Sequence, residues 1–291
     1  MDNTDWMIIH TLQKERNITA TAEKLFITQP ALTYRIKKIE KEFGANVFVR
    51  TTRGVFLTSY GSLIAQYSED MLKRYNEIKD IIASMSETVT GSIHVAVSPA
   101  FARHELAPVL VKFREKYPLV DIYINTSLST NAIELMMNDK VHVAIVRGNY
   151  NLNCETQLLS KEPITLIAKD EINLKELPKF PYIWYVTDIN LEREISNWWR
   201  ENYDVLPKTI MHINDSLACR KLVDSGLGFS ILPAIESDDY KKNFKFFTID
   251  LRNKEGKILT RPTLLVYKEP IKKVAAAKAF IDFVKQMFEK L

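Results

Sequence analysis

Apolar residues recur at helical spacing through the first sixty positions, and short polar turns interrupt them. This pattern predicts three helices: one up to about residue 16, a short one over 18–24, and one over 28–44. The first helix carries its apolar side chains on one face, at Trp6, Ile9 and Leu12. Three helices this short are expected to share one small core, with the third entered through a tight turn at 25–28.

The third helix separates into two faces. Its apolar face is expected to enter the core through Leu32, Ile36, Ile39 and Phe43, and Gly44 ends the helix. Its start and outer face carry Thr28, Gln29, Pro30, Thr33, Tyr34 and Lys37. Thr28 is a suitable N-cap, and proline is tolerated in a first turn. A recognition helix needs polar side chains at its N-terminus for base edges and cationic ones for phosphates, so this face is predicted to read double-stranded DNA.

A hairpin is predicted directly after the third helix. Apolar runs at 47–50 and 55–57 flank the turn-like residues 51–54, which suits the wing of a winged helix. Arg50 and Arg53 would then reach backbone phosphates or an adjacent minor groove. Taken alone, these features also fit a solvated amphipathic helix followed by an ordinary hairpin.

One long helix is predicted over residues 59–86, because no proline occurs there and no glycine follows Gly61. Apolar residues recur in it at alternating steps of three and four, at Ile64, Tyr67, Met71, Tyr75, Ile78, Ile82 and Met85. This seam suits a two-stranded coiled coil, and a dimer would supply the symmetry of a palindromic operator. The alternative is a helix that packs on its own domain.

The last two hundred residues alternate strands with helices. Strands are predicted at 93–97, 120–125 and 141–146, helices at 106–116 and 131–138, and a second unit of this kind over 163–262. The chain then returns through a strand at 264–267 and a final helix from 272. An α/β fold with a mostly parallel sheet follows, with ligands bound beyond the carboxyl ends of its strands.

Composition agrees with a DNA-binding protein that acts in the cytoplasm. The net charge is +4, and residues 1–61 hold nine Lys and Arg against six Asp and Glu. The N-terminus does not resemble a secretory signal, no apolar run is long enough for a membrane span, and a membrane partner is not expected. Cys154 and Cys219 are the two cysteines, which favours neither a disulfide framework nor a metal cluster. Cys219 is expected to pack inward from a helix.

Several segments together resemble the LysR-type regulators. They are Thr19–Leu25, Thr28–Thr33, Ile36, Ile39–Glu40, Phe43–Gly44, Phe48, Arg50, Arg53, Leu57–Thr58 and Gly61, and later Phe113–Pro118, Val141–Ile145 and Gly226–Pro233. Departures from the family pattern occur at Thr21, where an alanine is usual, at Arg16, where a glycine is usual, and at Thr33 and Tyr34. Base preference therefore cannot be copied from relatives.

The resemblance implies an N-terminal winged helix-turn-helix (1–60), a linker and dimerisation helix (61–89) and a two-lobed, periplasmic-binding-protein-like effector domain (90–291). Lobe I would comprise 91–161 and 266–291, and lobe II 162–265, joined by strands that cross near 160–163 and 262–266. It implies a transcription regulator that forms homodimers or homotetramers and whose operator binding responds to a small molecule.

Strand ends and helix starts suggest which residues line the effector cleft. They are Ser98, Phe101, Ser127, Ser129 and Arg147 from lobe I, and Thr187 and Asn190 from lobe II. Asp188 is the one acidic side chain expected beside these residues, so the cleft is expected to favour a small anion. Arg147 can equally belong to a solvated loop or an interlobe salt bridge, and Ser127 and Ser129 can be helix caps. The pair Trp198 and Trp199 is expected in the core.

Two other classes of protein fit the sequence less well. A solute-binding receptor would explain the last two hundred residues but neither the first ninety nor the missing export signal. An enzyme is not expected, since the five histidines show no metal-ligand spacing and no nucleophile elbow or phosphate-binding loop occurs. No cofactor and no metal are predicted.

Overall fold

The computed structural model describes residues 1–84, 88–234 and 246–289. Met85, the last position of the predicted seam, lies outside these ranges. The chain divides into two compact units, Met1–Met85 and Ser86–Leu291. Each unit holds a hydrophobic core of its own.

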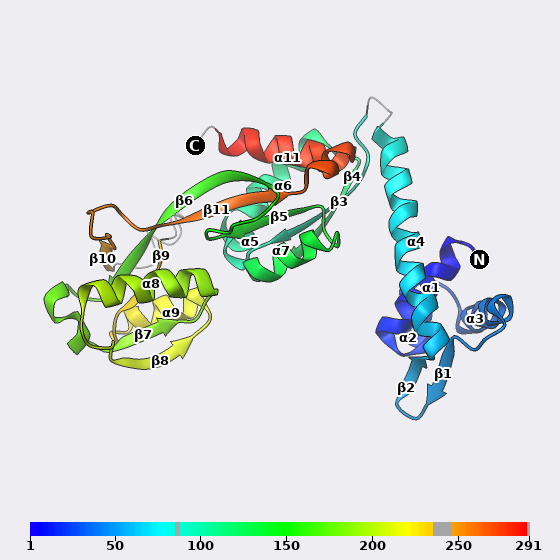
Figure 1. The fold of residues 1–291 in the computed structure, drawn as a ribbon, viewed down its shortest axis with the longest axis horizontal. Helices are drawn as coiled ribbons and strands as arrows, with labels where there is room; N and C mark the ends of the chain where they lie inside the picture. Colours follow the sequence, from blue (N-terminus) through cyan, green and yellow to red (C-terminus); the bar gives the residue numbers. More distant parts are fainter. Residues whose placement is uncertain (85–87, 235–245, 290–291) are drawn as a thin grey trace. The chain divides into compact units, whose positions relative to one another are not determined.

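The first unit is a helix-turn-helix with a hairpin and a long helix (Figure 1). Its elements are α1 (Asn3–Glu15), α2 (Ile18–Lys24), α3 (Gln29–Phe43), β1 (Phe48–Thr51), β2 (Gly54–Leu57) and α4 (Ser59–Ser84). The predicted order of three helices, hairpin and long helix is therefore confirmed. The core draws on every helix, with Ile9 and Leu12 of α1, Leu32 and Ile39 of α3 and Ile64 of α4 buried.

Capping residues set the ends of the first three helices. The Thr28 hydroxyl accepts a hydrogen bond from the Ala31 N–H at 3.4 Å, which confirms Thr28 as the N-cap of α3. Arg16 caps the end of α1 with φ of 52°, a left-handed conformation that explains why a glycine is usual there. The Arg16 guanidinium lies 5.3 Å from the ring centroid of Phe56, a cation–π contact that offsets part of the strain.

The second unit contains one large mixed sheet. Its strands are β3 (Gly91–Val97), β4 (Val120–Thr126), β5 (Val143–Arg147), β6 (Glu155–Ala168), β9 (Ser230–Pro233), β10 (Phe247–Asp250) and β11 (Thr260–Tyr267), in the order β10-β6-β11-β5-β3-β4 with β9 also paired to β6. In this sheet β3 pairs in parallel with β4 and β5, while β6 and β11 make antiparallel pairs. The expectation of a mostly parallel sheet was wrong, because the strands that run between the lobes return against the direction of the others.

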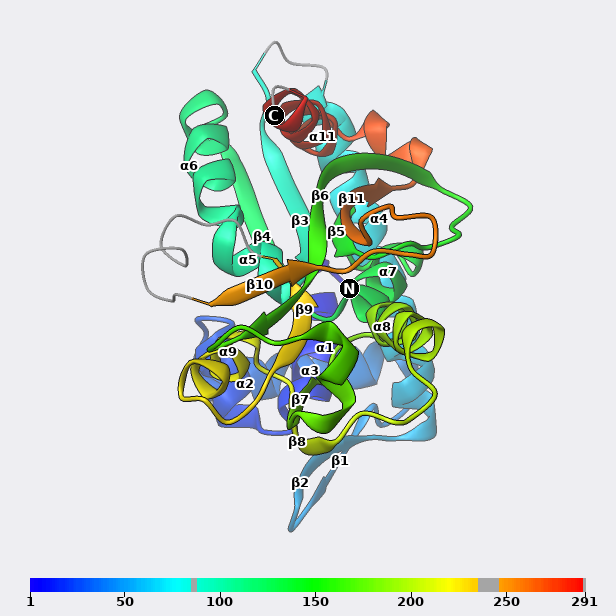
Figure 2. The ribbon, with the colours of Figure 1, turned by 90° about the vertical axis from the view of Figure 1, so that its left-hand side faces the viewer.

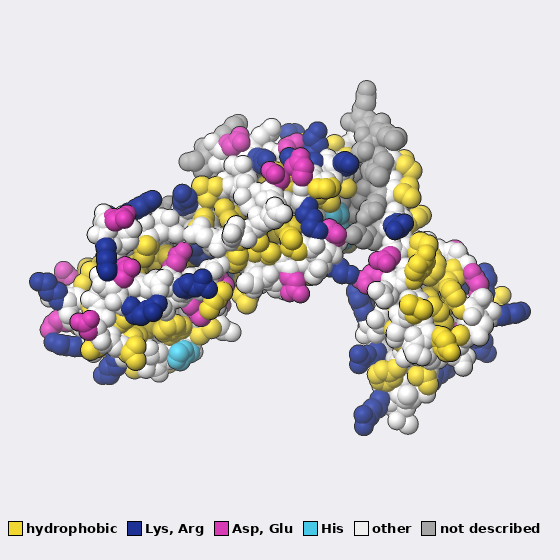
Figure 3. Space-filling view, in the orientation of Figure 1, with side chains coloured by type: hydrophobic (Ala, Val, Ile, Leu, Met, Phe, Trp, Pro, Cys, Tyr) yellow, Lys and Arg dark blue, Asp and Glu magenta, His cyan; other side chains and the backbone are white. Residues whose placement is uncertain are grey.

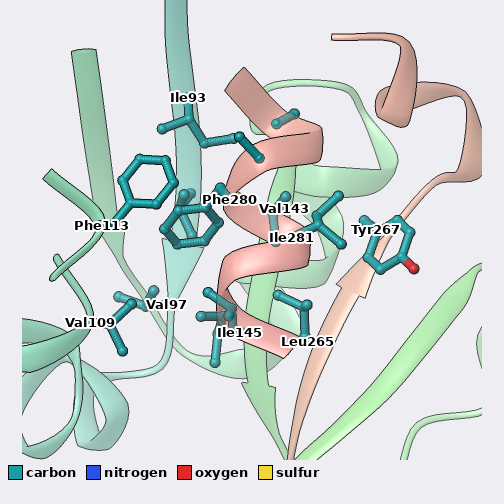
Figure 4. Packing of buried hydrophobic residues seen from close by; sticks show 14 of the residues in the cluster. Ile93, Val97, Val109, Phe113, Val143, Ile145, Leu265, Tyr267, Phe280 and Ile281 are labelled. Carbon is teal, nitrogen blue, oxygen red and sulfur yellow. The ribbon is translucent and has the colours of Figure 1, made fainter. Parts of the chain in front are cut away.

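Lobe I buries both faces of its part of the sheet. Helices α6 (Leu106–Lys116) and α11 (Ala275–Phe288) cover one face, and α7 (Ser129–Met137) covers the other (Figure 1). Figure 4 shows Phe280 of α11 beside Phe113 of α6, and the two rings meet edge-on with centroids 5.2 Å apart. The short helix α5 (Pro99–His104) follows β3 directly.

Lobe II is built around the far half of β6. Its remaining elements are η1 (Leu174–Lys179), β7 (Tyr182–Tyr185), α8 (Ile189–Asn202), β8 (Thr209–Ile213) and α9 (Ser216–Asp224), with η2 (Glu269–Lys273) near the C-terminus in lobe I. Trp198 and Trp199 of α8 are 4% and 5% exposed in its core, as predicted. Cys219 of α9 is fully buried against Val223 and Leu232, which confirms its inward packing.

Two strands pass between the lobes. The first half of β6 pairs with β11 in lobe I, and its second half pairs with β9 and β10 in lobe II (Figure 2). Glu162 and Arg261 face each other in register where these strands cross. The predicted crossing segments near 160–163 and 262–266 lie on these two strands.

Candidate DNA interface and effector site

The polar face of α3 is open to solvent. Gln29, Pro30 and Lys37 are exposed, Tyr34 is 71% exposed, and Thr33 is half-buried beneath them. Together they line a surface hollow of about 560 Å³. The structure thus brings the residues predicted for base reading onto one surface of one helix, with Thr28 at its start.

An ion-pair cluster that the sequence analysis did not single out anchors α3 to α1. Arg35 lies 2.7 Å from a carboxylate oxygen of Asp5 and 3.0 Å from one of Asp2. Asp5 is 1% exposed. The hydrogen bonds that Arg35 donates to both carboxylates raise its own pKa, and Arg35 lowers the pKa of Asp2. Because Arg35 stands beside Tyr34 on α3, this cluster fixes how the helix presents its outer face.

The hairpin is held against the same helix. Glu40 of α3 accepts hydrogen bonds from the backbone N–H groups of Val47 (2.9 Å) and Phe48 (3.3 Å). Arg50 and Arg53 are exposed on the hairpin, and Figure 3 shows basic side chains at its tip. Glu40 therefore fixes the start of the hairpin to α3.

Apolar side chains remain exposed on the first unit, around α4. Trp6, Phe43, Ala45, Tyr60, Leu63, Ile64 and Tyr67 line a hollow of about 350 Å³, and hydrophobic side chains gather on this unit in Figure 3. The expectation that Phe43 enters the core was wrong: it is 45% exposed, because the stripe of α3 drifts out of the core at the last turn. Its neighbours Ile36 and Ile39 are buried as predicted.

Four charged residues meet where β6 and β11 pass between the lobes: Arg147, Glu162, Asp188 and Arg261, hereafter the junction cluster. Arg147, the last residue of β5, forms an ion pair with Glu162 of β6, and Arg261 of β11 forms one with Asp188 of lobe II. Arg147 and Arg261 are 6% and 5% exposed. Burial, followed by repulsion from Arg147, lowers the pKa of Arg261, and burial raises the pKa of Glu162.

Besides its ion pair with Arg261, Asp188 caps the start of a helix. Its Oδ1 accepts hydrogen bonds from the N–H groups of Asn190 (3.1 Å) and Leu191 (3.3 Å), which makes it the N-cap of α8. Its Oδ2 faces Arg261. The helix start that the sequence analysis offered to a ligand is therefore already capped by a carboxylate of the chain.

Arg147 and the two serines occupy positions that differ from the expected ones. The Arg147 N–H donates to the Ser129 hydroxyl at 3.0 Å, and the N-cap of α7 is Leu128, which makes no side-chain cap. Ser129 and Ser127 are thus not helix caps. Of the alternatives for Arg147, the structure supports the salt bridge, with Glu162 as the partner.

The other predicted effector residues divide into those at the junction and those away from it. Ser98 caps α5 through the Phe101 N–H, and the Phe101 ring packs into the lobe I core at 1% exposure. The Thr187 N–H donates to Glu192. Asn190 lies at the junction, since a Cβ built on Gly148 would lie 3.7 Å from its side chain.

The acidity of the region was underestimated. Besides Asp188, the junction holds Glu162, and the carboxyl of Glu105 lies close enough that burial and then Glu162 raise its pKa. The sequence pattern does not identify Glu162, because this residue lies inside a long strand whose two halves belong to different lobes. It does not identify Arg261 for the same reason, although Arg261 precedes Pro262 at a predicted crossing point.

A further group missed from the sequence is Tyr150, in the loop after β5. Its hydroxyl is buried near Ser129 and Asn190 without a hydrogen bond of normal geometry to a described residue. Burial, followed by Asp188, raises its pKa, and the interactions with Ser129 and Asn190 partly offset that rise. No group of His, Cys, Asp and Glu among the described residues is arranged to hold a metal ion. Within the same residues, no helix combines the length and the apolar character that a membrane crossing needs.

Comparison with known proteins places both units in one family. Residues 4–62 match the family described as "Bacterial regulatory helix-turn-helix protein, lysR family", and residues 86–289 match the "LysR substrate binding domain". The chain belongs to the LysR family. It is a DNA-binding transcriptional regulator with a C-terminal effector-binding domain, and its relatives are regulators rather than enzymes, which confirms both expectations.

Relatives of this regulator align along almost the whole chain. The "Uncharacterized HTH-type transcriptional regulator YraN" of Bacillus subtilis is 35% identical over 98% of each chain. The "HTH-type transcriptional activator IlvY" of Haemophilus influenzae is 25% identical over 86% of this chain and 89% of its own. Among solved structures, full-length CbnR complexed with its target DNA covers 98% of this chain and 99% of its own, with 16% identity and a TM-score of 0.65. That structure is similar in fold.

Proposed function

We propose that this LysR-type regulator reads a palindromic operator through α3 and its wing. Gln29 and Thr33, with Tyr34 beside them, would contact base edges in the major groove. Lys37 on the same face and Arg50 and Arg53 on the hairpin would hold phosphates. The observation that carries the proposal is the open polar surface of α3, which ends in a cationic side chain and is joined to a basic hairpin.

Gln29→Ala tests this reading. The variant should bind its operator about 10- to 100-fold more weakly and random DNA about as well as before, because base contacts contribute roughly 1–3 kcal/mol of specificity. The measurement is a fluorescence-anisotropy titration of both DNAs at fixed salt. Gln13→Ala, an exposed glutamine on α1, is the matched control and should leave both affinities unchanged. An unaltered ratio of specific to random binding in Gln29→Ala would refute the placement of α3 in the groove.

We propose further that the chain acts in the cytoplasm as a homodimer joined through α4, or as a homotetramer made of two such dimers. Tyr67, Tyr75, Ile78 and Ile82 are 44–62% exposed along this helix, which is more apolar surface than a solvated helix normally leaves open. Residues 1–60 would then read DNA, 61–89 would join two chains, and 90–291 would bind the effector.

The effector site is proposed at the junction cluster and the polar residues around it. Ligand closure of the two lobes would shift operator binding only as far as the ligand prefers one lobe arrangement. Support comes from the convergence of Ser129, Tyr150 and Asn190 on the junction. Tyr150→Phe should weaken a ligand's effect on operator binding and leave ligand-free operator binding within about two-fold, measured by anisotropy with and without ligand.

A further inference from the structure

Three polar atoms at the junction, and a fourth just past the end of β4 beside β3, are buried and make no hydrogen bond of normal geometry to the residues described. They are Oε2 of Glu162, Nε of Arg261 and the hydroxyl oxygens of Ser127 and Tyr150. Buried polar groups in folded proteins are paired with protein, ordered water or ligand. The unpaired groups around the junction cluster therefore define which hydrogen-bond donors and acceptors a ligand bound there must supply.

The two charged residues among them, Glu162 and Arg261, need opposite kinds of hydrogen-bond partner. Glu162 uses Oε1 for Arg147 and leaves Oε2 as an acceptor, so it requires a donor. Arg261 uses its terminal nitrogen for Asp188 and leaves Nε–H as a donor, so it requires an acceptor. Because Glu162 and Arg261 face each other across β6 and β11, their Cβ atoms lie only about 5 Å apart. One small molecule can meet both demands at once.

Charge balance points the same way. The junction cluster contains two guanidinium groups and two carboxylates, already joined as Arg147–Glu162 and Arg261–Asp188. Arg220 and Glu105, whose charges interact with Glu162, add one charge of each sign around it. A bare carboxylate or inorganic oxyanion would satisfy Arg261 but would bring an unbalanced negative charge beside Glu162 into a desolvated site. A ligand with one group of each sign adds no net charge and pairs both residues.

We infer that the effector is a zwitterion of the α-amino-acid class. Its carboxylate accepts from Nε of Arg261, its ammonium donates to Oε2 of Glu162, and the Ser127 and Tyr150 hydroxyls complete the polar contacts. This inference rests on the proposed effector site at the junction cluster. It revises the simple anion expected from the sequence, which satisfies only the Arg261 side of the site.

The experiment is a calorimetric titration of the full-length protein with the proteinogenic amino acids. Any that binds is compared with its 2-hydroxy acid, its desamino acid and its decarboxylated amine. An amino acid should bind, and removal of either charged group should weaken binding at least ten-fold. Glu162→Gln should weaken amino-acid binding at least ten-fold and narrow the gap between the amino acid and its desamino acid. Glu171→Gln, an exposed carboxylate of lobe II, is the matched control and should bind as wild type does.

Three results would overturn the zwitterion. They are binding of a desamino acid or an oxyanion as tightly as any amino acid, a Glu162→Gln protein with unchanged preference, and failure of the whole amino-acid panel to bind. Ligand-free operator binding by Glu162→Gln, expected within about two-fold of wild type, reports that the variant is folded. If another class of ligand binds and Tyr150→Phe weakens its effect, the effector site stands and only the ligand class fails. If an amino acid binds but neither Tyr150→Phe nor Glu162→Gln changes that binding, the site itself is wrong.

Discussion

At the scale of the residue, His142 shows how one buried side chain links stability to pH. It lies between α7 and β5, where its Nδ1 accepts a hydrogen bond from the His94 N–H at 3.3 Å, and its ring meets the His94 ring edge-on at a centroid distance of 5.3 Å. Burial, followed by the charge of His94, lowers the pKa of His142 to about 4. The neutral ring is the form that fits, because an imidazolium has no acceptor for the His94 N–H.

A lowered histidine pKa makes the folded state lose stability as pH falls. The unfolded chain takes up a proton near pH 6.5 and the folded one only near pH 4, so stability should fall across that interval and this contribution should level off below it. The loss assigned to His142 is at most about 3 kcal/mol.

Replacement of His142 should remove that pH dependence. In His142→Asn, an amide oxygen takes the place of Nδ1, so the variant should lose less stability than wild type between pH 6.5 and 4, measured by urea unfolding of the effector domain. His212→Asn, an exposed histidine on β8, should retain the wild-type slope. A His142→Asn protein with an unchanged slope would show that this histidine does not titrate as described.

At the scale of the element, the two halves of α4 differ in burial, so packing on its own domain and a coiled-coil contact apply to different parts of the helix. Near its start, Ile64 and Ala65 are buried against the helix-turn-helix core, so this part packs on its own domain. Further along, Ile78 and Ile82 are 58% and 62% exposed. The coiled-coil prediction therefore concerns the second half of the helix, beyond the reach of the small domain.

Charges placed on that second half should prevent the dimer. Ile78→Asp with Ile82→Asp would bury two carboxylates in the helix contact, at several kcal/mol each, and should lower operator affinity at least ten-fold. Sedimentation velocity checks the assembly state and anisotropy the affinity. Substitution of two exposed polar residues of α3, Lys38→Asp and Lys41→Asp, controls for added charge on the first unit and should leave the assembly state unchanged. An unchanged assembly state and affinity in the isoleucine double variant would exclude α4 as the dimer contact.

At the scale of the whole molecule, the chain consists of units with separate cores, and none of the hydrophobic clusters identified among the described residues contains residues of both. Gly61 near the start of α4 is essential to the first unit's packing. A Cβ there would lie 1.9 Å from the Val47 carbonyl oxygen, a contact that backbone movement alone can relieve.

Gly61→Ala should therefore destabilise one unit and not the other. The expected loss is at least about 2 kcal/mol, confined to residues 1–84, because overpacking of a fixed backbone costs about 1–3 kcal/mol. Hydrogen exchange followed by mass spectrometry resolves the two units. Gly44→Ala, with φ of 64° but open space around its Cβ, should cost only about 1 kcal/mol. Equal acceleration of exchange in both units would mean that they fold as one.

The sequence by itself determined the elements whose signals are local. The capped helix after Thr28, the hairpin turn, the long helix from Ser59 and the buried tryptophans of α8 follow from spacing, capping and turn chemistry, each confined to a few residues. The outer face of α3 follows for the same reason, since a helix places its residues on faces by their spacing alone.

Only the tertiary structure decided what happens between segments distant along the chain. It made the sheet mixed by returning β6 and β11 against their neighbours, and it paired Arg147 with Glu162 and Arg261 with Asp188. A strand that belongs to two lobes has no single buried face, so alternation along it cannot show which side chains meet. The partner of a buried charge is selected by the fold, which brings together residues that lie 15 and 73 positions apart.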